Sequence, residues 1–447
     1  MSCKASSYVL KTLAEDGKMI LKNTLTQSIV KVSKEKIEAV EKILNNPPCN
    51  YDGMDSLARK LYERGFIIED YVDEQQIVDY IFNNAVYGNN VLELTIIPTN
   101  ACNFDCLYCY QKAPYYYMSN ETAEKLLLFL RKHIKEYSGL LISWFGGEPL
   151  LAKELMVYLM SNIRKICIEN SVPFYSNITT NGYELDLHTF CELTKNHLRY
   201  YQITIDGPLD IHNVQRPHKT QHDSFEKIVG NLIQIKNNCS NVNYKIALRV
   251  NVSSALQPHL EEFVNWLYDT FGNDRHFVIV WEFVRDWGGD KIENNRELIQ
   301  SHEESDKWLD VLSKRGFAVN IGYEQTDLTI ALCIASKKNG YVFNHDGKLY
   351  KCAMVVEEDE FKQINCIGQI KGNGDLEIDT GKVVKWIGRS NVEDKCFCCA
   401  HYPECMGVNC PLGSQILKQK NRCSELFVDD YEYLLRNRDV IGKTEEL

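Results

Sequence analysis

The middle of the chain alternates between short apolar runs and longer stretches whose apolar residues share one helical face. Apolar runs bounded by Gly, Pro or Asn predict strands, and the stretches between them predict amphipathic helices. Because a helix separates each pair of consecutive predicted strands, we expect parallel strands covered by helices, with functional loops at the carboxyl ends of the strands. The predicted strands are 91–97, 140–145, 174–180, 200–206, 245–252 and 277–284, and the predicted helices are 119–137, 154–170, 187–196, 225–237 and 258–271.

A different pattern precedes this alternation. A predicted β-hairpin, 18–23 with 28–32, is followed by helices at 34–44 and 54–65 and by a short strand at 66–68. Gly65 is a typical end for the second helix. This compact set of elements indicates a small N-terminal module over residues 1–88.

Composition and charge exclude several classes of function. A chain of 447 residues is long enough for two or three domains, and 44% hydrophobic residues suffice for packed cores. The net charge of −11, without a basic stripe, argues against nucleic acid as the main partner. No apolar run approaches the length of a membrane span, and the first residues do not resemble a signal peptide. We therefore expect a cytoplasmic protein without a membrane partner.

Cysteines are numerous and unevenly distributed. The chain has 17 of them, and eight fall between Cys352 and Cys423. The cytosol keeps thiols reduced, so a disulfide framework is not expected. Metal clusters are the more economical interpretation, and several iron–sulfur clusters would require an anaerobic or oxygen-protected setting.

Three cysteines follow the first predicted strand: Cys102, Cys106 and Cys109, at a Cys-x3-Cys-x2-Cys spacing. Three thiolates leave one corner of a [4Fe–4S] cluster for a ligand that is not protein. This spacing resembles the radical S-adenosylmethionine (SAM) superfamily. The resemblance implies that SAM chelates the fourth iron and is cleaved to a 5′-deoxyadenosyl radical, and that Tyr108 lies near the adenine. A zinc site with a distant fourth ligand is the alternative.

Polar motifs end the next three strands. Gly146-Gly147-Glu148-Pro149 matches an element of the same superfamily, in which the glycines allow close backbone approach and Glu148 offers a carboxylate to the ammonium group of SAM. The resemblance assigns Thr180 and Asn181, and Thr204 at the end of the next strand, to positioning the ribose and methionine parts of SAM. Arg216 would pair with a carboxylate of SAM or of the substrate. For each of these residues, a turn or a helix cap is the alternative.

The C-terminal region carries a second cysteine pattern, which resembles the SPASM extension of radical SAM enzymes that modify peptides and sulfatases. The resemblance implies two auxiliary [4Fe–4S] clusters, and its crossed ligand order divides the cysteines into two sets. The first set has only three cysteines, so its fourth iron is either open or held by Cys366 or Cys398. Zinc is an alternative for the second set. The first set is Cys333, Cys352 and Cys410, and the second is Cys396, Cys399, Cys405 and Cys423.

Together these patterns predict an α/β protein in three parts: an N-terminal winged-helix-like module (1–88), a partial (β/α)6 radical SAM barrel (89–323) and a cysteine-rich SPASM domain (324–447). The N-terminal module resembles those that bind leader peptides, although a simple buttress for the barrel is the alternative. The expected cofactors are SAM and three [4Fe–4S] clusters.

The expected function is thioether cross-linking of a cysteine-containing precursor peptide with a leader, with flavodoxin or ferredoxin as electron donor. An open iron in the first auxiliary cluster would hold a substrate thiolate. Formylglycine formation, as in anaerobic sulfatase maturases, and carbon–carbon cross-linking are the alternatives. Against formylglycine formation, Ala353 occupies the position at which those maturases have an acidic base. A binding protein with structural clusters is the non-enzymatic alternative.

Overall fold

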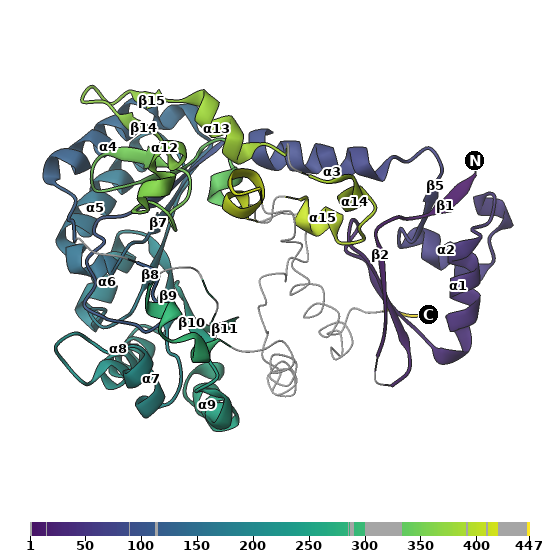
Figure 1. Ribbon diagram of the computed structural model, residues 1–447, viewed down its shortest axis with the longest axis horizontal. Coiled ribbons are helices and arrows are strands. Elements are labelled where there is room, and N and C mark those ends of the chain that lie inside the picture. Colours follow the sequence, from purple (N-terminus) through teal and green to yellow (C-terminus); the bar gives the residue numbers. More distant parts are fainter. Residues whose placement is uncertain are drawn as a thin grey trace.

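The computed structural model describes residues 2–14, 16–88, 90–111, 115–284, 286, 290–299, 333–389, 392–407, 410–418 and 445–447. Cys423 lies outside the described residues. The largest element is a ten-stranded sheet (Figure 1), in which six consecutive strands run parallel. This confirms the predicted parallel α/β fold. The parallel strands are β6 (Val91–Ile96), β7 (Gly139–Trp144), β8 (Phe174–Thr180), β9 (Leu198–Thr204), β10 (Lys245–Val252) and β11 (Phe277–Phe283).

Helices cover the outer face of this curved sheet (Figure 1). Their starts are capped as the sequence favours: Ser119 accepts a hydrogen bond from the Thr122 amide, and Asp186 accepts one from the Thr189 amide. The five predicted helices are present, and two shorter ones, α7 and α10, were not predicted because so few residues show no repeating apolar face. The helices are α4 (Asn120–His133), α5 (Lys153–Glu169), α6 (Leu187–Lys195), α7 (Leu209–Gln215), α8 (Ser224–Asn238), α9 (Leu260–Leu267) and α10 (Asp290–Glu293).

The cysteine-rich region continues the same sheet. β12 (Gly340–Phe343) pairs in parallel with β6, and three antiparallel strands extend the sheet outward from β12. The sheet therefore crosses the predicted boundary between the second and third parts. The remaining elements here are β13 (Lys348–Tyr350), β14 (Cys366–Ile370), β15 (Leu376–Ile378), α12 (Lys362–Asn365), α13 (Thr380–Ile387), α14 (Asp394–Phe397) and α15 (Tyr402–Cys405).

The N-terminal module has its own small core. An antiparallel sheet packs against two helices through Leu21, Val30, Val40 and Leu61. The predicted hairpin, helices and strand are present, whereas β1 and β2 were not predicted. The elements are β1 (Cys3–Ala5), β2 (Val9–Leu13), β3 (Met19–Asn23), β4 (Ile29–Val32), α1 (Ile37–Asn45), α2 (Ser56–Glu63) and β5 (Ile67–Glu69), with β16 (Glu445–Glu446) added beside β4.

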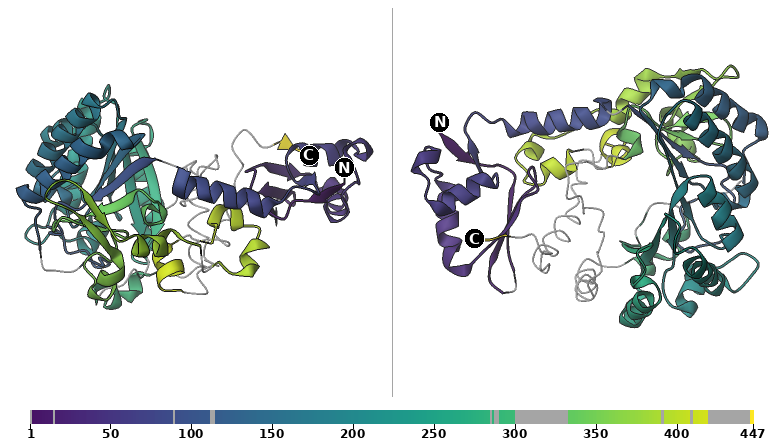
Figure 2. Two further views of the ribbon diagram at one scale, coloured as in Figure 1. Left: turned by 90° about the horizontal axis from the view of Figure 1, so that it is seen from above. Right: turned by 180° about the vertical axis from the view of Figure 1, so that it is seen from behind.

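α3 (Glu74–Asn83) extends from this module to the large sheet (Figure 2), and the cysteine-rich region lies along it. Lys22 on β3 forms an ion pair with Glu404 at 2.6 Å, and Arg389 forms one with Asp79 on α3 at 2.8 Å. The N-terminal module is thereby tied to the segment that carries Cys396, Cys399 and Cys405. Within the described residues, no helix combines the length and the apolar character needed to cross a membrane.

Candidate functional site

The loop after β6 brings Cys102, Cys106 and Cys109 together. Their thiols interact electrostatically with one another, and Cys106 is buried. Burial, with smaller contributions from Glu148 and Cys109, raises the pKa of Cys102 to about 11. Burial also raises the pKa of Cys106 to about 12, although Arg216 opposes the shift. Three crowded thiols have no partner among the described residues that would hold them as thiolates, whereas a bound iron–sulfur cluster would take them as thiolate ligands and offset their negative charge. The donor set fits an iron–sulfur cluster.

Gly146 and Gly147 are required by the cysteine loop itself. A Cβ on Gly146 would lie 2.2 Å from the Thr99 carbonyl oxygen, and one on Gly147 would lie 2.2 Å from that of Ala101. The Gly147 amide donates to Thr99 at 3.2 Å. The sequence predicted that these two glycines let a ligand come close to the backbone. Their contact with the neighbouring loop is an additional role. Their contact with SAM stays a prediction.

Glu148 connects the ends of β7 and β8. Its side chain is 0% exposed and accepts hydrogen bonds from the Thr180 hydroxyl at 2.7 Å and the Asn181 amide at 2.7 Å. It also caps the following turn through the Leu150 amide at 2.9 Å. Burial raises the pKa of Glu148, and these hydrogen bonds oppose the rise. The predicted residues Glu148, Thr180 and Asn181 are thus brought together, and the predicted alternative of a cap is also observed.

A second buried carboxylate, Asp206, was not predicted as a site residue. The Tyr108 hydroxyl donates to its side chain, and the Asn251 amide donates to it at 2.8 Å. Arg216 lies 3.8 Å from Asp206 and donates to the Tyr108 hydroxyl at 2.8 Å. Burial raises the pKa of Asp206, with Arg216 opposing the shift. Asp206 could have been predicted as a site residue, because it ends the predicted fourth strand. Nothing in the sequence marks Asn251 as a site residue. Thr204 is buried on β9.

Two buried donors beside the cysteine loop lack an acceptor among the described residues: Arg216 Nε and Asn103 Nδ2. The other end of the Asn103 amide accepts a hydrogen bond from Asn181 at 2.7 Å. Buried polar groups without partners are rare and usually mark a site for water or a ligand. A ligand with oxygen acceptors, such as the carboxylate and ribose of SAM, fits these two donors.

The first predicted auxiliary set is also gathered. Cys333, Cys352 and Cys410 interact electrostatically. Burial raises the pKa of Cys352 to about 12, and the other two thiols add to the rise. Cys366 is directed at its own strand, 3.9 Å from the Gly368 carbonyl oxygen, and Cys398 interacts with Tyr8 of the N-terminal module.

Cys396, Cys399 and Cys405 of the second set lie on and between α14 and α15. In the described part of the chain, no three His, Cys, Asp or Glu side chains converge in the arrangement of a bound metal ion. The ligand assignments of Cys102, Cys106 and Cys109 and of both auxiliary sets therefore stay predictions.

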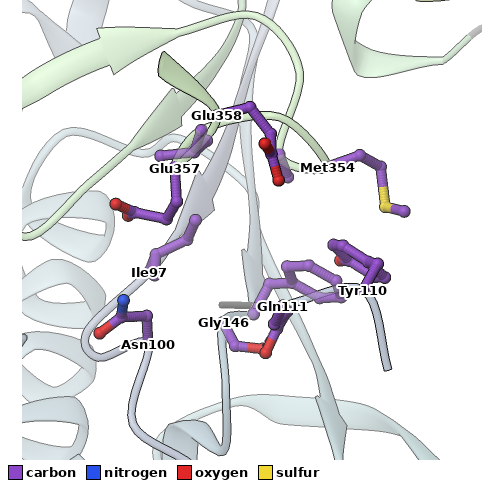
Figure 3. Close-up of a pocket in the computed structure, with 11 residues that line it drawn as sticks. Ile97, Asn100, Tyr110, Gln111, Gly146, Met354, Glu357 and Glu358 are labelled. Atoms are coloured by element: carbon purple, nitrogen blue, oxygen red, sulfur yellow. The ribbon is translucent and has the colours of Figure 1, made fainter. Parts of the chain in front are cut away.

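A pocket opens among the loop after β6, the loop after β7 and the segment 353–358 that follows β13 (Figure 3). It encloses about 410 Å³ including its open mouth. Glu358 directs its carboxylate into this space, whereas that of Glu357 turns to the other side, where it accepts a hydrogen bond from Asn344 at 3.2 Å. Neither Glu357 nor Glu358 was predicted from the sequence as a site residue. The lining residues are Ile97, Asn100, Tyr110, Gln111, Phe145, Gly146, Ala353, Met354, Val356, Glu357 and Glu358.

A parallel sheet whose first strand leads into a three-cysteine loop, held by Gly146 and Gly147 of the next strand, is the arrangement of a radical SAM domain. Residues 96–248 match the family model of the radical SAM superfamily, so the chain contains such a domain.

Among curated proteins, the chain is 37% identical over 103 residues to GTP 3′,8-cyclase from Campylobacter jejuni, which is 22% of this chain and 30% of that protein. It is 28% identical over 148 residues to the cysteine-type anaerobic sulfatase-maturating enzyme from Clostridium perfringens, which is 31% of this chain and 39% of that protein. The chain thus spans about a third of the length of these two relatives.

Solved structures share the fold over a longer stretch. Native anSMEcpe with bound AdoMet has a TM-score of 0.54 at 20% identity, covering 71% of this chain and 88% of that one. Streptococcus suis SuiB bound to S-adenosylmethionine has a TM-score of 0.50 at 14% identity, covering 90% of this chain and 95% of that one. The alignment with SuiB extends over most of both chains.

Proposed function

We propose that this protein is a radical SAM enzyme that forms thioether cross-links in a ribosomally synthesised precursor peptide. The observation that carries the proposal is the position of the pocket. Tyr110 follows Cys109 directly and Ala353 follows Cys352 directly, and both residues line the same pocket. A peptide residue in this pocket would therefore lie between the SAM-cluster loop and the first auxiliary set.

Residues of this chain could fill the separate roles that such a reaction requires. When bound, SAM and the reduced cluster supply the 5′-deoxyadenosyl radical that removes a hydrogen atom from the acceptor carbon. Glu148, Arg216 and Asn103 would orient SAM, and the apolar side of the pocket would exclude water from the radical. Cys333, Cys352 and Cys410 offer three soft donors, so a peptide thiol would complete a set of four.

The N-terminal module would bind the leader of the precursor. Its β3 strand touches the segment of the second auxiliary set through Lys22 and Glu404. Recognition of the leader would therefore take place on a surface joined to the catalytic half of the chain, and the substrate portion would extend from there toward the pocket.

The test uses the full chain with its clusters, dithionite, SAM and a cysteine-containing precursor peptide. We expect 5′-deoxyadenosine and a peptide that has lost two hydrogen atoms per cross-link. Addition of the peptide should also change the electron paramagnetic resonance signal of the first auxiliary cluster, and the same peptide with Ser in place of Cys should not. Cys366→Ala and Cys398→Ala are the controls, since loss of iron in either variant would show that the chain itself supplies the fourth ligand.

The second candidate is oxidation of Cys or Ser to formylglycine, the reaction suggested by the sulfatase-maturating relative. Ala353 argues against it, while Glu358 provides a carboxylate in the same pocket. An aldehyde that reacts with hydrazine probes, formed without a cross-link, would favour this candidate over thioether formation.

A further inference from the structure

Lys351 is a fully buried lysine directly before Cys352. Its side chain is 0% exposed, and its ammonium group donates hydrogen bonds to the backbone carbonyls of Lys337 at 2.6 Å and Gly340 at 2.8 Å. Both carbonyls belong to the segment that follows Cys333. A lysine is rarely buried to this degree unless it is paired. Lys351 thus joins the segments that carry two cysteines of the first auxiliary set.

The backbone at Lys351 is fixed as well. The side-chain oxygen of Asn365, which is fully buried, accepts hydrogen bonds from the amides of Lys351 at 3.1 Å and Cys352 at 2.8 Å. The side-chain amide of Asn365 donates in return to the Cys352 carbonyl at 2.9 Å. Lys351 is therefore held both at its backbone and at its ammonium group, so its charge has a fixed position.

Lys351 belongs to a group of charges with one positive charge in excess. Lys337 forms an ion pair with Glu93 at 2.6 Å, and Glu93 also acts electrostatically on Lys351, so two ammonium groups share one carboxylate. Burial disfavours the thiolate form of Cys333, whereas both lysines favour it. A buried positive charge is tolerated when negative groups compensate it, and the thiolates of a bound cluster would do so here.

A positive charge in this place would change the reduction potential of an iron–sulfur cluster. Reduction adds one electron, and with it one negative charge, to the cluster. A buried cation nearby stabilises the reduced form more than the oxidised form, and the net charge around a cluster is one of the factors that set its potential. Salt and water screen such an interaction much less in the interior than at the surface.

We propose that Lys351, together with Lys337, raises the reduction potential of the cluster predicted at Cys333, Cys352 and Cys410. Lys351 is a positioning residue in this role, because it acts through its charge and through the segments that it joins, and not as a ligand. The inference rests on the auxiliary cluster of the proposed function and is independent of thioether formation.

The experiment is a potentiometric titration of the full chain with its clusters, without SAM or peptide, followed by electron paramagnetic resonance. The signal of the first auxiliary cluster is the one that Cys352→Ala lacks. Lys351→Gln keeps a hydrogen-bond donor and removes the charge. At a fixed potential we expect its ratio of reduced to oxidised cluster to fall at least about tenfold, which is a downward shift of about 59 mV for one electron. Lys348→Gln on β13 is the matched control, because the Lys348 side chain is 50% exposed, and it should leave the potential unchanged.

Lys351→Arg separates the charge from a purely structural role. It keeps the positive charge and should keep the potential of the unmodified protein. Equal shifts in Lys351→Arg and Lys351→Gln, or no shift in Lys351→Gln, would overturn the proposal.

A second position covers the case in which Lys351→Gln does not retain the cluster. Lys337→Gln removes the other positive charge and leaves the backbone carbonyl in place, and an unchanged potential in that variant would overturn the proposal. An unmodified protein without any signal that depends on Cys352 would also refute it, because no cluster would be bound there. Failure to form a thioether, in contrast, would refute the proposed function and leave the measured potentials intact.

Discussion

Two fully buried carboxylates, Glu148 and Asp206, join the ends of neighbouring parallel strands, and Asp206 also accepts a hydrogen bond from Tyr108 of the cysteine loop. Each is 0% exposed and is surrounded by donors from neighbouring strands. A buried charge of this kind is tolerated only when its partners are in place. The site is therefore rigid at the residue scale, and changes to these partners should affect stability as well as chemistry.

For Asp206→Asn, we expect the free energy of unfolding to fall by about 3–5 kcal/mol, because Arg216 is left buried without its counter-charge. Urea titration measures this change. Asp210→Asn, an exposed residue on α7, is the control and should stay within about 0.5 kcal/mol of the unmodified protein. Similar values for both variants would contradict a stabilising role for the Asp206 network.

For Glu148→Ala, we expect SAM affinity to fall about ten- to a hundredfold, or roughly 1.5–3 kcal/mol, if the carboxylate binds the SAM ammonium group. The iron content should stay unchanged. Glu148→Gln preserves the size of the side chain and separates charge from packing. Calorimetric titration with SAM measures the affinity; unchanged affinity in both variants would mean that Glu148 serves only to join β7 to β8.

Sequence patterns identified most residues at this scale, because the cysteine and Gly-Gly-Glu-Pro motifs have fixed spacings. The partners of these motifs were harder to find. Asn251 and Glu358 reach the site from strands and loops far away in the chain, and nothing local distinguishes them from ordinary polar residues.

At the scale of elements, the loop after β6 and the loop after β7 form one unit. The absence of a side chain at Gly146 and Gly147 allows the two backbones to touch. β6 and β10 were readily predictable as apolar runs because both strands are buried along most of their length. The contact between their loops was not, because it depends on backbone positions that periodicity does not encode.

For Gly147→Ala, we expect loss of the SAM cluster and of SAM cleavage, since the new Cβ would displace the Ala101 carbonyl and with it the cysteine loop. Gly230→Ala on α8 is the matched control, because nothing lies within 4 Å of its Cβ position. The control should be about 0.5–1 kcal/mol more stable than the unmodified protein. Iron analysis and 5′-deoxyadenosine formation measure both variants, and full activity of Gly147→Ala would show that the loops can separate.

At the scale of the whole molecule, the N-terminal module is connected to the cysteine-rich region by charged contacts. Burial raises the pKa of Glu404, but His401 and Lys22 outweigh this effect and hold the pKa below its ordinary value of 4.5. A carboxyl group whose pKa is lowered in the folded state contributes its full stabilisation at pH values above its ordinary pKa. This contribution is lost as the pH falls through the lowered pKa of the folded state.

We therefore expect the contact between β3 and the Cys396–Cys405 segment to be intact at pH 7 and to weaken below about pH 4.5. Lys22→Met, which removes the charge and keeps most of the side chain, should weaken it already at pH 7. Lys11→Met, on the exposed side of β2, is the control. Hydrogen exchange across residues 19–27 measures the contact, and equal protection in both variants would rule out a role for the Lys22–Glu404 pair.

The three-part organisation was only partly predictable. Each part has its own pattern, but β12 joins the cysteine-rich region to β6, and β16 pairs with β4 of the N-terminal module. Pairings between strands so distant in sequence leave no local trace, so the order of the parts could be predicted while their connections could not.

The continuity of β6 with β12 and β13 also has a consequence for electron transfer. Neighbouring strands in a sheet are about 4.8 Å apart, and this spacing does not change when domains move. Cys102, Cys106 and Cys109 follow β6, and Cys352 follows β13 two strands away. Clusters bound at these cysteines would be held at a constant separation, so the opening or closing of the molecule would not change the distance over which an electron passes between them.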